Sequence, residues 1–242
     1  MAQEPKFRHF DVSEGLPSST VYQAFQDSKG YVWFCTEAGI TRFDGTYIEN
    51  FTMDDGLADN EIFGLFEDSK GRIWTRSYNG KYAYFQNGYI YNEYDFPFFE
   101  EMELGAWVTE IFEDSDGNVY FAASGRGFVV LTADNQVIKK YGTGLQKQVD
   151  DFFKKEKNAT LFDGSIKVIG FREMAKNNIT IITSHAEYRF NPKTRKITLQ
   201  KFYSNQVSQI HYFNNDQILA THKSNDREVF LYKNNDFQPY YN

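Results

Sequence analysis

An internal repeat constrains the fold of this chain more than any other feature of its sequence. A stretch that opens at Val21 returns at Ile62, 41 residues later, and again at Val108, another 46 residues on. Each copy holds an apolar run, an Asp-x-x-Gly segment and a second apolar run that contains Trp or Tyr. A period in the low forties, with several short strands per copy, is typical of one blade of a β-propeller. The sequence therefore predicts an all-β fold, a β-propeller of four-stranded antiparallel blades.

Within one copy, the local chemistry predicts four strands joined by tight turns. The apolar run at 21–25 is too short for a helix and is followed by the turn sequence at 27–30, Asp-Ser-Lys-Gly. Asp suits the first position of a type I turn, and Gly takes the left-handed residue that follows. Trp33, in the second strand, supplies bulk that packs between neighbouring sheets. The related segment at 114–117 is expected to be such a turn rather than a calcium loop, because it lacks the ligands of an EF-hand.

We expect residues 1–242 to form a single β-propeller domain in which about five blades are visible. The predicted blades are 21–53, 62–96, 107–142, 166–203 and 207–241. Residues 6–12 match the end of a blade, because Phe10 precedes Gly15 by five residues as Phe51 precedes Gly56. They are therefore expected to form an N-terminal outer strand. Either five blades close a ring with one outer strand displaced, or the chain is a fragment of a larger ring, which is the alternative that we favour.

Residues 144–165 interrupt the repeat and are expected to form an insertion with one short helix at 146–157. A competing register makes 149–153 the first strand of the fourth blade, which fits the spacing but leaves too many strands behind it. We favour the insertion because Val168 then precedes Thr183 by 15 residues, which is the spacing of the paired strands in the first blade.

The composition excludes several classes of function. A net charge of -7 argues against a nucleic-acid surface, which needs a basic stripe. No apolar run approaches the length that spans a membrane. The one cysteine, Cys35, falls in a predicted inner strand, so we expect a buried free thiol. The chain shows no signal peptide, but Ala-Gln-Glu-Pro after Met1 looks like a mature end left after signal removal.

Two stretches share a longer pattern: Gly-Leu, a polar pair, an apolar strand, Asp-x-x-Gly, an apolar strand with Trp, and a closing Gly. They are GLPSSTVYQAFQDSKGYVWFCTEAGITRFDG (15–45) and GLADNEIFGLFEDSKGRIWTRSYNG (56–80). This pattern resembles the two-component regulator propeller repeat, closely in the first two blades, partly in the third and only in outline in the last two.

The resemblance implies a periplasmic sensor region of a bacterial histidine kinase, as in hybrid two-component regulators and kinases that signal to LytTR-type regulators. It further implies that a second β domain, a membrane helix and a kinase follow the propeller. None of these parts is in this chain, so contact with a membrane is expected only through an absent segment.

In a propeller, the loops that enter each inner strand and those between strands two and three lie at the same end of the blades. At this end we expect a site for a small polar ligand such as a saccharide. Arginines there would bind a carboxylate or uronate through paired hydrogen bonds, and aromatic rings would stack on a sugar. The candidate ligand-binding residues are Glu37, Arg76, Tyr78, Trp107, Arg126 and His222, with Ser18, Ser19, Asn60 and Glu61 in the entry loops.

The sequence gives little support for an enzyme. The four histidines fall in unrelated registers, which gives no support to a metal cluster or a catalytic triad, and no cofactor is expected. Glu37 and Glu61 form the strongest carboxylate pair, and other propellers place His and Glu on this face, so a lyase or hydrolase stays an alternative. A second alternative is a protein-interaction propeller that forms a homodimer through its aromatic outer edges. The sequence favours a binding module.

Overall fold

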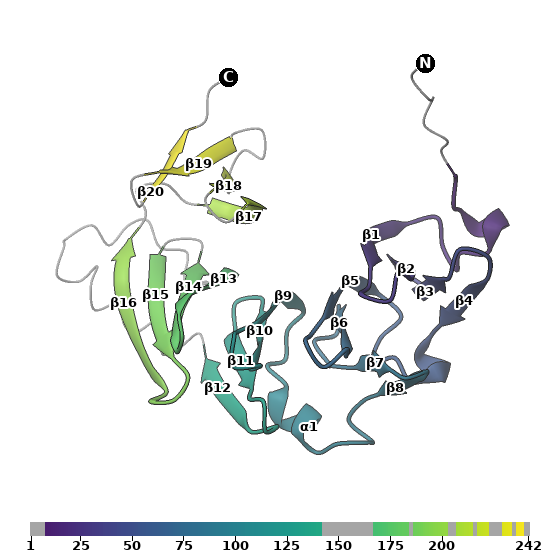
Figure 1. The fold of residues 1–242 in the computed structure, drawn as a ribbon, viewed down its shortest axis with the longest axis horizontal. Coiled ribbons are helices and arrows are strands. Elements are labelled where there is room, and N and C mark those ends of the chain that lie inside the picture. Colours follow the sequence, from purple (N-terminus) through teal and green to yellow (C-terminus); the bar gives the residue numbers. More distant parts are fainter. Residues whose placement is uncertain are drawn as a thin grey trace. The chain divides into compact units, whose positions relative to one another are not determined.

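The computed structural model describes residues 8–141, 167–183, 186–202, 207–214, 217–222, 229–233 and 236–239. Across these ranges the strands form five four-stranded sheets, and every sheet is antiparallel with its strands in chain order (Figure 1). This arrangement confirms the predicted fold, a β-propeller of four-stranded blades, and each sheet is one blade.

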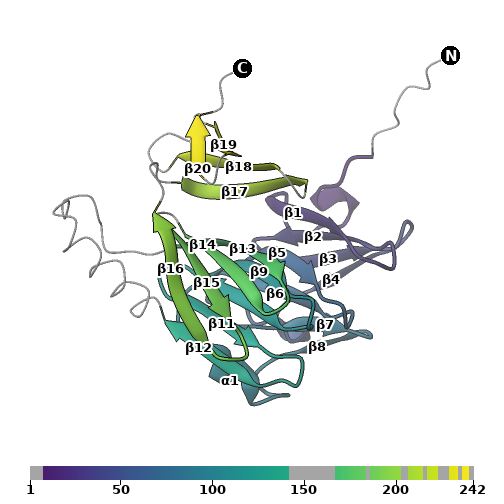
Figure 2. The ribbon, with the colours of Figure 1, turned by 60° about the vertical axis from the view of Figure 1, so that its left-hand side comes forward.

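The strands of the first two sheets are β1 (Val21–Gln26), β2 (Val32–Thr36), β3 (Gly39–Phe43), β4 (Ile48–Phe51), β5 (Ile62–Glu67), β6 (Ile73–Ser77), β7 (Tyr84–Gln86) and β8 (Tyr89–Tyr91). Those of the third and fourth are β9 (Val108–Glu113), β10 (Val119–Ala123), β11 (Gly127–Leu131), β12 (Val137–Tyr141), β13 (Val168–Ala175), β14 (Asn178–Thr183), β15 (Ala186–Asn191) and β16 (Lys196–Phe202). The fifth sheet consists of β17 (Val207–Asn214), β18 (Gln217–His222), β19 (Val229–Lys233) and β20 (Asp236–Pro239). In Figure 2 the long strands β13 to β16 lie side by side in one sheet.

The chain divides into two compact units, residues 1–103 and residues 104–242. In the first unit, the sheets β1–β4 and β5–β8 share one core, where Trp33 and Ile40 meet Ile62 and Phe85. In the second unit the sheets β9–β12 and β13–β16 share another core, built mainly from aromatic and β-branched side chains. Whether residues 1–242 form a single domain stays a prediction, and each unit is described by itself.

In the first three blades, the turn after the inner strand is held by an aspartate, as predicted. Asp27 accepts backbone N–H groups of Lys29 and Tyr31 on one oxygen and the indole N–H of Trp33, at 2.8 Å, on the other. The closing Gly30 has a φ of +88°, the left-handed conformation that the bulge requires. The aspartate is therefore a structural acceptor that joins its turn to the core tryptophan.

A second contact joins neighbouring sheets at the same turns. The backbone N–H and hydroxyl of Ser28 both donate to the carboxylate of Glu67 at the end of β5, each at 2.7 Å. In the second unit, Ser115 makes the same pair of bonds to Glu173 of β13, each at 2.8 Å. This serine clamp is thus a repeated feature of the blade-to-blade contact.

The N-terminal outer strand predicted at 6–12 is not observed in its described part. Residues 8–11 form no strand, and Val12 begins a short 3-10 helix, η1 (Val12–Glu14). The reason is local, because Asp11 caps that helix by accepting the backbone N–H groups of Ser13 and Glu14.

The predicted register between this segment and the end of the first blade nevertheless holds. A matching helix, η2 (Met53–Asp55), follows β4, and Gly15 and Gly56 close the two helices with φ of +107° and +105°. Phe10 packs on Phe34 and Phe43, with ring centroids 4.9 and 5.1 Å apart. Phe10 thus packs on the first blade as Phe51 packs on the second.

The second blade, predicted at 62–96, ends in a turn and a short helix after its outer strand. Its outer strand ends at Tyr91, before a turn in which Asn92 donates its backbone N–H to Asp95. Pro97 then leads into the helix α1 (Phe98–Met102). The predicted insertion at 144–165, its helix at 146–157 and the competing strand at 149–153 lie outside the described residues.

Cys35 is a buried free thiol, as the sequence predicted. Burial raises the pKa of Cys35 to about 12, against a weaker opposing effect of the charge of Arg76. Within the described ranges, no helix is both long and apolar enough to cross a membrane.

Candidate functional site

The entry loops and the loops between second and third strands lie at one end of the sheets, as predicted. The backbone N–H of Gly39 donates to the carbonyl of Asn60 at 2.7 Å, and that of Tyr78 donates to Glu61 at 3.1 Å. In the second unit, Ser124 donates to the carbonyl of Trp107 at 3.1 Å. Direct hydrogen bonds thus fix the loops at this end of each unit.

Each inner strand carries an irregularity close to this end. The pairing of β1 with β2 skips Tyr22, and the pairing of β5 with β6 skips Phe63. Comparable shifts occur in the sheets that begin with β9, β13 and β17. A β-bulge re-aims the side chain of the extra residue. In the first unit, the two re-aimed side chains are both aromatic.

These two rings and Tyr78 form a short aromatic row. The ring centroids of Tyr22 and Phe63 are 5.0 Å apart, and those of Phe63 and Tyr78 are 6.0 Å apart. The row reaches solvent at both ends, since Tyr22 is 39% exposed and Tyr78 is 57% exposed. Exposed aromatic rings of this kind offer faces and edges for a ligand with an apolar surface.

Two carboxylates lie close to Tyr22, at one end of the row. Glu37 accepts the hydroxyl of Ser18 at 2.8 Å, and Glu61 accepts the hydroxyl of Tyr22 at 2.9 Å. The bond to Glu61, followed by burial and the charges of Glu61 and Glu37, raises the pKa of Tyr22, so its hydroxyl stays protonated at neutral pH. We call the set of Tyr22, Glu37, Glu61, Phe63 and Tyr78 the aromatic–acidic surface.

Arg76 was expected in a loop, and the structure places it within the strand β6, opposite Gly64. Any side chain at position 64 would overlap the guanidinium of Arg76 and the amide oxygen of Gln23. That amide oxygen accepts the backbone N–H of Leu65 at 2.7 Å. The absence of a side chain at Gly64 thus lets Arg76 lie half-buried across the inner strand, close to Gln23.

The other predicted site residues belong to the second unit. Trp107 precedes β9 and is 39% exposed, and Arg126 lies exposed in the turn between β10 and β11. His222 ends the strand β18, paired with Val207, and its side chain lies outside what the structure describes. Of the predicted set, Glu37, Arg76 and Tyr78 therefore lie in the first unit, and Trp107, Arg126 and His222 lie in the second.

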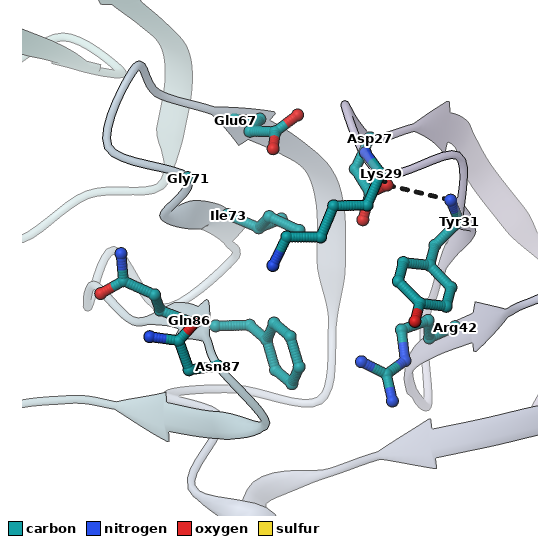
Figure 3. A pocket seen from close by; sticks show the side chains of 10 residues that line it. Asp27, Lys29, Tyr31, Arg42, Glu67, Gly71, Ile73, Gln86 and Asn87 are labelled. Carbon is teal, nitrogen blue, oxygen red and sulfur yellow. Dashed lines mark hydrogen bonds between the residues drawn. The ribbon is translucent and has the colours of Figure 1, made fainter.

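A small hollow lies at the opposite end of the first two sheets (Figure 3). The turn after β1, the turn after β5 and the turn after β7 surround it. It is shallow, and a large part of its volume of about 280 Å³ is open solvent. It is lined by Asp27, Lys29, Tyr31, Arg42, Glu67, Gly71, Ile73, Phe85, Gln86 and Asn87. We call it the turn-side hollow.

Sequence reasoning missed Tyr22, Phe63 and the whole turn-side hollow. The signal for the first two was available, because adjacent apolar residues at Val21-Tyr22 and Ile62-Phe63 break strict alternation at the start of a strand. In the part of the chain that the structure describes, no group of three or more His, Cys, Asp or Glu side chains is placed to hold a metal ion.

Two segments of the chain match the two component regulator propeller family, residues 15–38 and residues 56–79. The first contains Tyr22 and Glu37, and the second contains Glu61, Phe63 and Tyr78. The chain therefore carries two repeats of this family, and they include the whole aromatic–acidic surface.

The fold is similar to that of solved bacterial propellers. The extracellular domain of the hybrid two component system BT3049 from B. thetaiotaomicron has a TM-score of 0.66 and 15% identity, over 97% of this chain and 32% of that one. That of BT4673 from the same organism has a TM-score of 0.52 and 14% identity, over 92% of this chain and 38% of that one. PorZ, a surface component of the type-IX secretion system of Porphyromonas gingivalis, has a TM-score of 0.60 and 11% identity, over 91% and 28%.

This chain thus spans about a third of the length of those solved chains. At these identities the likeness shows the fold, a β-propeller. The comparison with curated proteins gives no match.

Proposed function

We propose that this chain, which carries two repeats of the two component regulator propeller family, is an extracytoplasmic ligand-sensing module of a two-component sensor kinase. The repeats and the likeness to extracellular domains of hybrid two-component systems support this role. Kinase activity and the membrane anchor would belong to other parts of a longer protein. The role of this region is binding, with no catalytic step.

The aromatic–acidic surface is the ligand site in this proposal, and a saccharide is the ligand class that fits its chemistry. A sugar ring has apolar C–H faces that pack on aromatic rings such as Tyr22 and Tyr78. It also carries hydroxyl groups, which would donate to the carboxylates of Glu37 and Glu61. The single observation that carries the proposal is the row Tyr22–Phe63–Tyr78 with the carboxylates of Glu37 and Glu61 close to Tyr22.

Signalling would follow from a shift between two arrangements of the sensor. A ligand shifts such an equilibrium only by its difference in affinity for the two states. In the second and third blades the entry loop and the second loop are hydrogen-bonded to each other, so a ligand that binds one loop also acts on the other.

A thermal-shift screen of the purified chain against neutral mono- and oligosaccharides tests this proposal. The melting temperature should rise with saccharide concentration, because a ligand that binds only the folded state stabilises it. Tyr78→Ala and Glu61→Gln should each abolish the rise, and Tyr47→Ala, at a tyrosine 75% exposed outside the surface, should keep it. A rise that survives both site variants would overturn the assignment of the surface.

Homodimer formation is the second candidate, and exposed tyrosines on the second blade favour it. Tyr89 is 70% exposed in the outer strand β8, and Tyr94 is 90% exposed in the turn that follows. Light scattering on the same sample separates the two functions. A dimer that dissociates in the double variant Tyr89→Ser with Tyr94→Ser would support self-association through this edge.

A further inference from the structure

We propose that the turn-side hollow is a separate binding site for the carboxylate group of a small monoanionic molecule. The hollow and the aromatic–acidic surface lie at opposite ends of the six-residue strand β1, about 20 Å apart at the rise of an extended chain. The two sites therefore share no residue, and the inference goes beyond the proposed sensing function.

The acidic groups of the hollow already have their hydrogen bonds. Asp27 accepts two backbone N–H groups and the indole N–H of Trp33. Both oxygens of Glu67 are bound by Ser28. The oxygens of these carboxylates are consequently poorly available to a cation or to a hydrogen-bond donor on a ligand.

The groups that remain available are donors. Figure 3 shows the side chain of Lys29 reaching across the hollow toward Ile73. Among the described residues, no carboxylate forms an ion pair with the Lys29 ammonium, and none hydrogen-bonds the side-chain amide of Asn87. An ammonium and an amide N–H₂ that line one small hollow from two different turns suit an oxygen anion that lies between them.

Arg42 adds a fixed positive charge to the wall. Its guanidinium lies 4.9 Å from the ring centroid of Tyr31 and 5.2 Å from that of Phe85. One of its nitrogens, Nη2, is bound by Glu49, which together with the rings holds the group in place. A charge held in this way attracts an anion without the loss of side-chain entropy that a free arginine would suffer.

Charge and size select the class of anion. Asp27 and Glu67 line the same hollow as Lys29 and Arg42, so the wall charges balance, and a dianion such as phosphate would gain no net attraction to offset its larger loss of hydration. The volume of about 280 Å³, which includes open solvent, admits only a small group. The floor is formed by Ile73 and Phe85, against which a short apolar stem would pack.

The test is an NMR titration of the full chain with propionate and with propionamide, its neutral isostere. The methyl resonances of Ile73, assigned by substitution to Val, report on the floor of the hollow. Propionate should shift them in a saturable manner and propionamide should not, and added sodium chloride should weaken the effect. Equal shifts with both compounds, or no shift with propionate, would overturn the proposal.

Two matched lysines make the test specific. Lys29→Gln should weaken propionate binding by about fivefold, since an ion pair at an exposed site contributes up to about that factor. Lys70→Gln removes the same charge at the same turn position of the next blade, outside the lining, and should leave binding within twofold. An equal loss of affinity in both variants would mean that propionate responds only to the long-range charge of the protein. That result would contradict a specific site in the hollow.

Two further variants control for misfolding of the turn and for binding of propionate at the aromatic–acidic surface. Asn87 has a φ of +52°, so Asn87→Gly removes the amide and keeps the turn, and should also weaken propionate binding. Tyr78→Ala should leave propionate binding unchanged, because it alters only the aromatic–acidic surface. Loss of propionate binding in Tyr78→Ala, or full binding in Asn87→Gly, would contradict the assignment.

Discussion

The carboxylate of Asp68 accepts the indole N–H of Trp74 at 2.8 Å, and both side chains are buried. The same bond joins Asp27 to Trp33 at 2.8 Å in the preceding blade. In the third blade a tyrosine takes the place of the tryptophan, and its hydroxyl donates to the aspartate at 2.8 Å. In these three blades, the aspartate that begins the turn therefore hydrogen-bonds a large aromatic side chain of the second strand. This bond explains why the aspartate and the aromatic residue recur together in the sequence.

Asp68→Ala should lower the free energy of unfolding by about 3 to 5 kcal/mol, because it leaves a buried positive charge without its partner. Asp68 also accepts the Nε–H of Arg72 at 2.6 Å, and Arg72 is only 7% exposed as a side chain. Urea unfolding followed by tryptophan fluorescence measures the change. Asp54→Ala, at an exposed aspartate, is the control, and an equal effect of both variants would argue against the anchor.

The serine clamp between the first two blades should contribute about 1 kcal/mol, because it consists of charge-assisted hydrogen bonds in a partly exposed position. A double-mutant cycle with Ser28→Ala and Glu67→Gln measures it directly. We expect the sum of the losses in the two single variants to exceed the loss in the double variant by about this coupling energy. Strict additivity would show that the clamp contributes nothing to stability.

Cys35 should resist alkylation in the folded protein. Its thiol is buried, and burial raises its pKa to about 12, so at pH 8.5 iodoacetamide should label it only in urea. The folded pKa lies above the ordinary value of 9.0, so the unfolded state loses the proton first. Stability should therefore fall as the pH rises from 9 toward 12, and Cys35→Ala should reduce that fall. Rapid labelling of the native protein would contradict the burial of this thiol.

Phe10→Ala should destabilise the first unit by about 1 to 2 kcal/mol, since a half-buried phenylalanine contributes less than one in the core. Phe51→Ala, at the equivalent position 41 residues later at the end of β4, removes a side chain that is only 7% exposed and should cost more. Thermal unfolding compares the two, with Tyr47→Ala as the exposed control. A Phe10→Ala protein that melts like the control would mean that the N-terminal segment does not pack on the first blade.

Much of the fold followed from the repeat. The spacing of 15 residues placed Val21 opposite Thr36 and Val168 opposite Thr183, and both pairs are observed. The turn aspartates and the buried tryptophans also followed, because turn geometry and core packing depend on residues close in sequence. Five four-stranded sheets are consequently predictable from periodicity and turn chemistry.

The candidate site was predictable only in part. Glu37 and Tyr78 could be assigned to the correct end of the blades, because the strand connectivity alone puts the loops that hold them at that end. Tyr22 and Phe63 were missed although adjacent apolar residues offered a signal, because a bulge depends on the register of two strands, and that register decides which way the extra side chain points. Arg76 was misplaced for a different reason, since its strand continues past the position where a loop was expected.

The turn-side hollow has no signal in the sequence of either blade. It depends on two sheets that place Lys29 and Asn87, far apart in the chain, on facing walls. The outer strand expected at 6–12 was wrong for a more local reason, because Asp11 caps a 3-10 helix in place of extending a strand. Contacts between sheets and side-chain caps are thus the two kinds of interaction that the repeat pattern did not reveal.

Saturation-transfer NMR with neutral saccharides tests the central claim most directly. Irradiation of the aromatic protons of the protein should transfer saturation to the ring protons of a bound sugar, because Tyr22 and Tyr78 would contact its C–H face. The account predicts clear transfer in the wild type, loss in Tyr78→Ala and retention in Tyr47→Ala. Equal transfer in the wild type and Tyr78→Ala, or none to any saccharide of the panel, would contradict it.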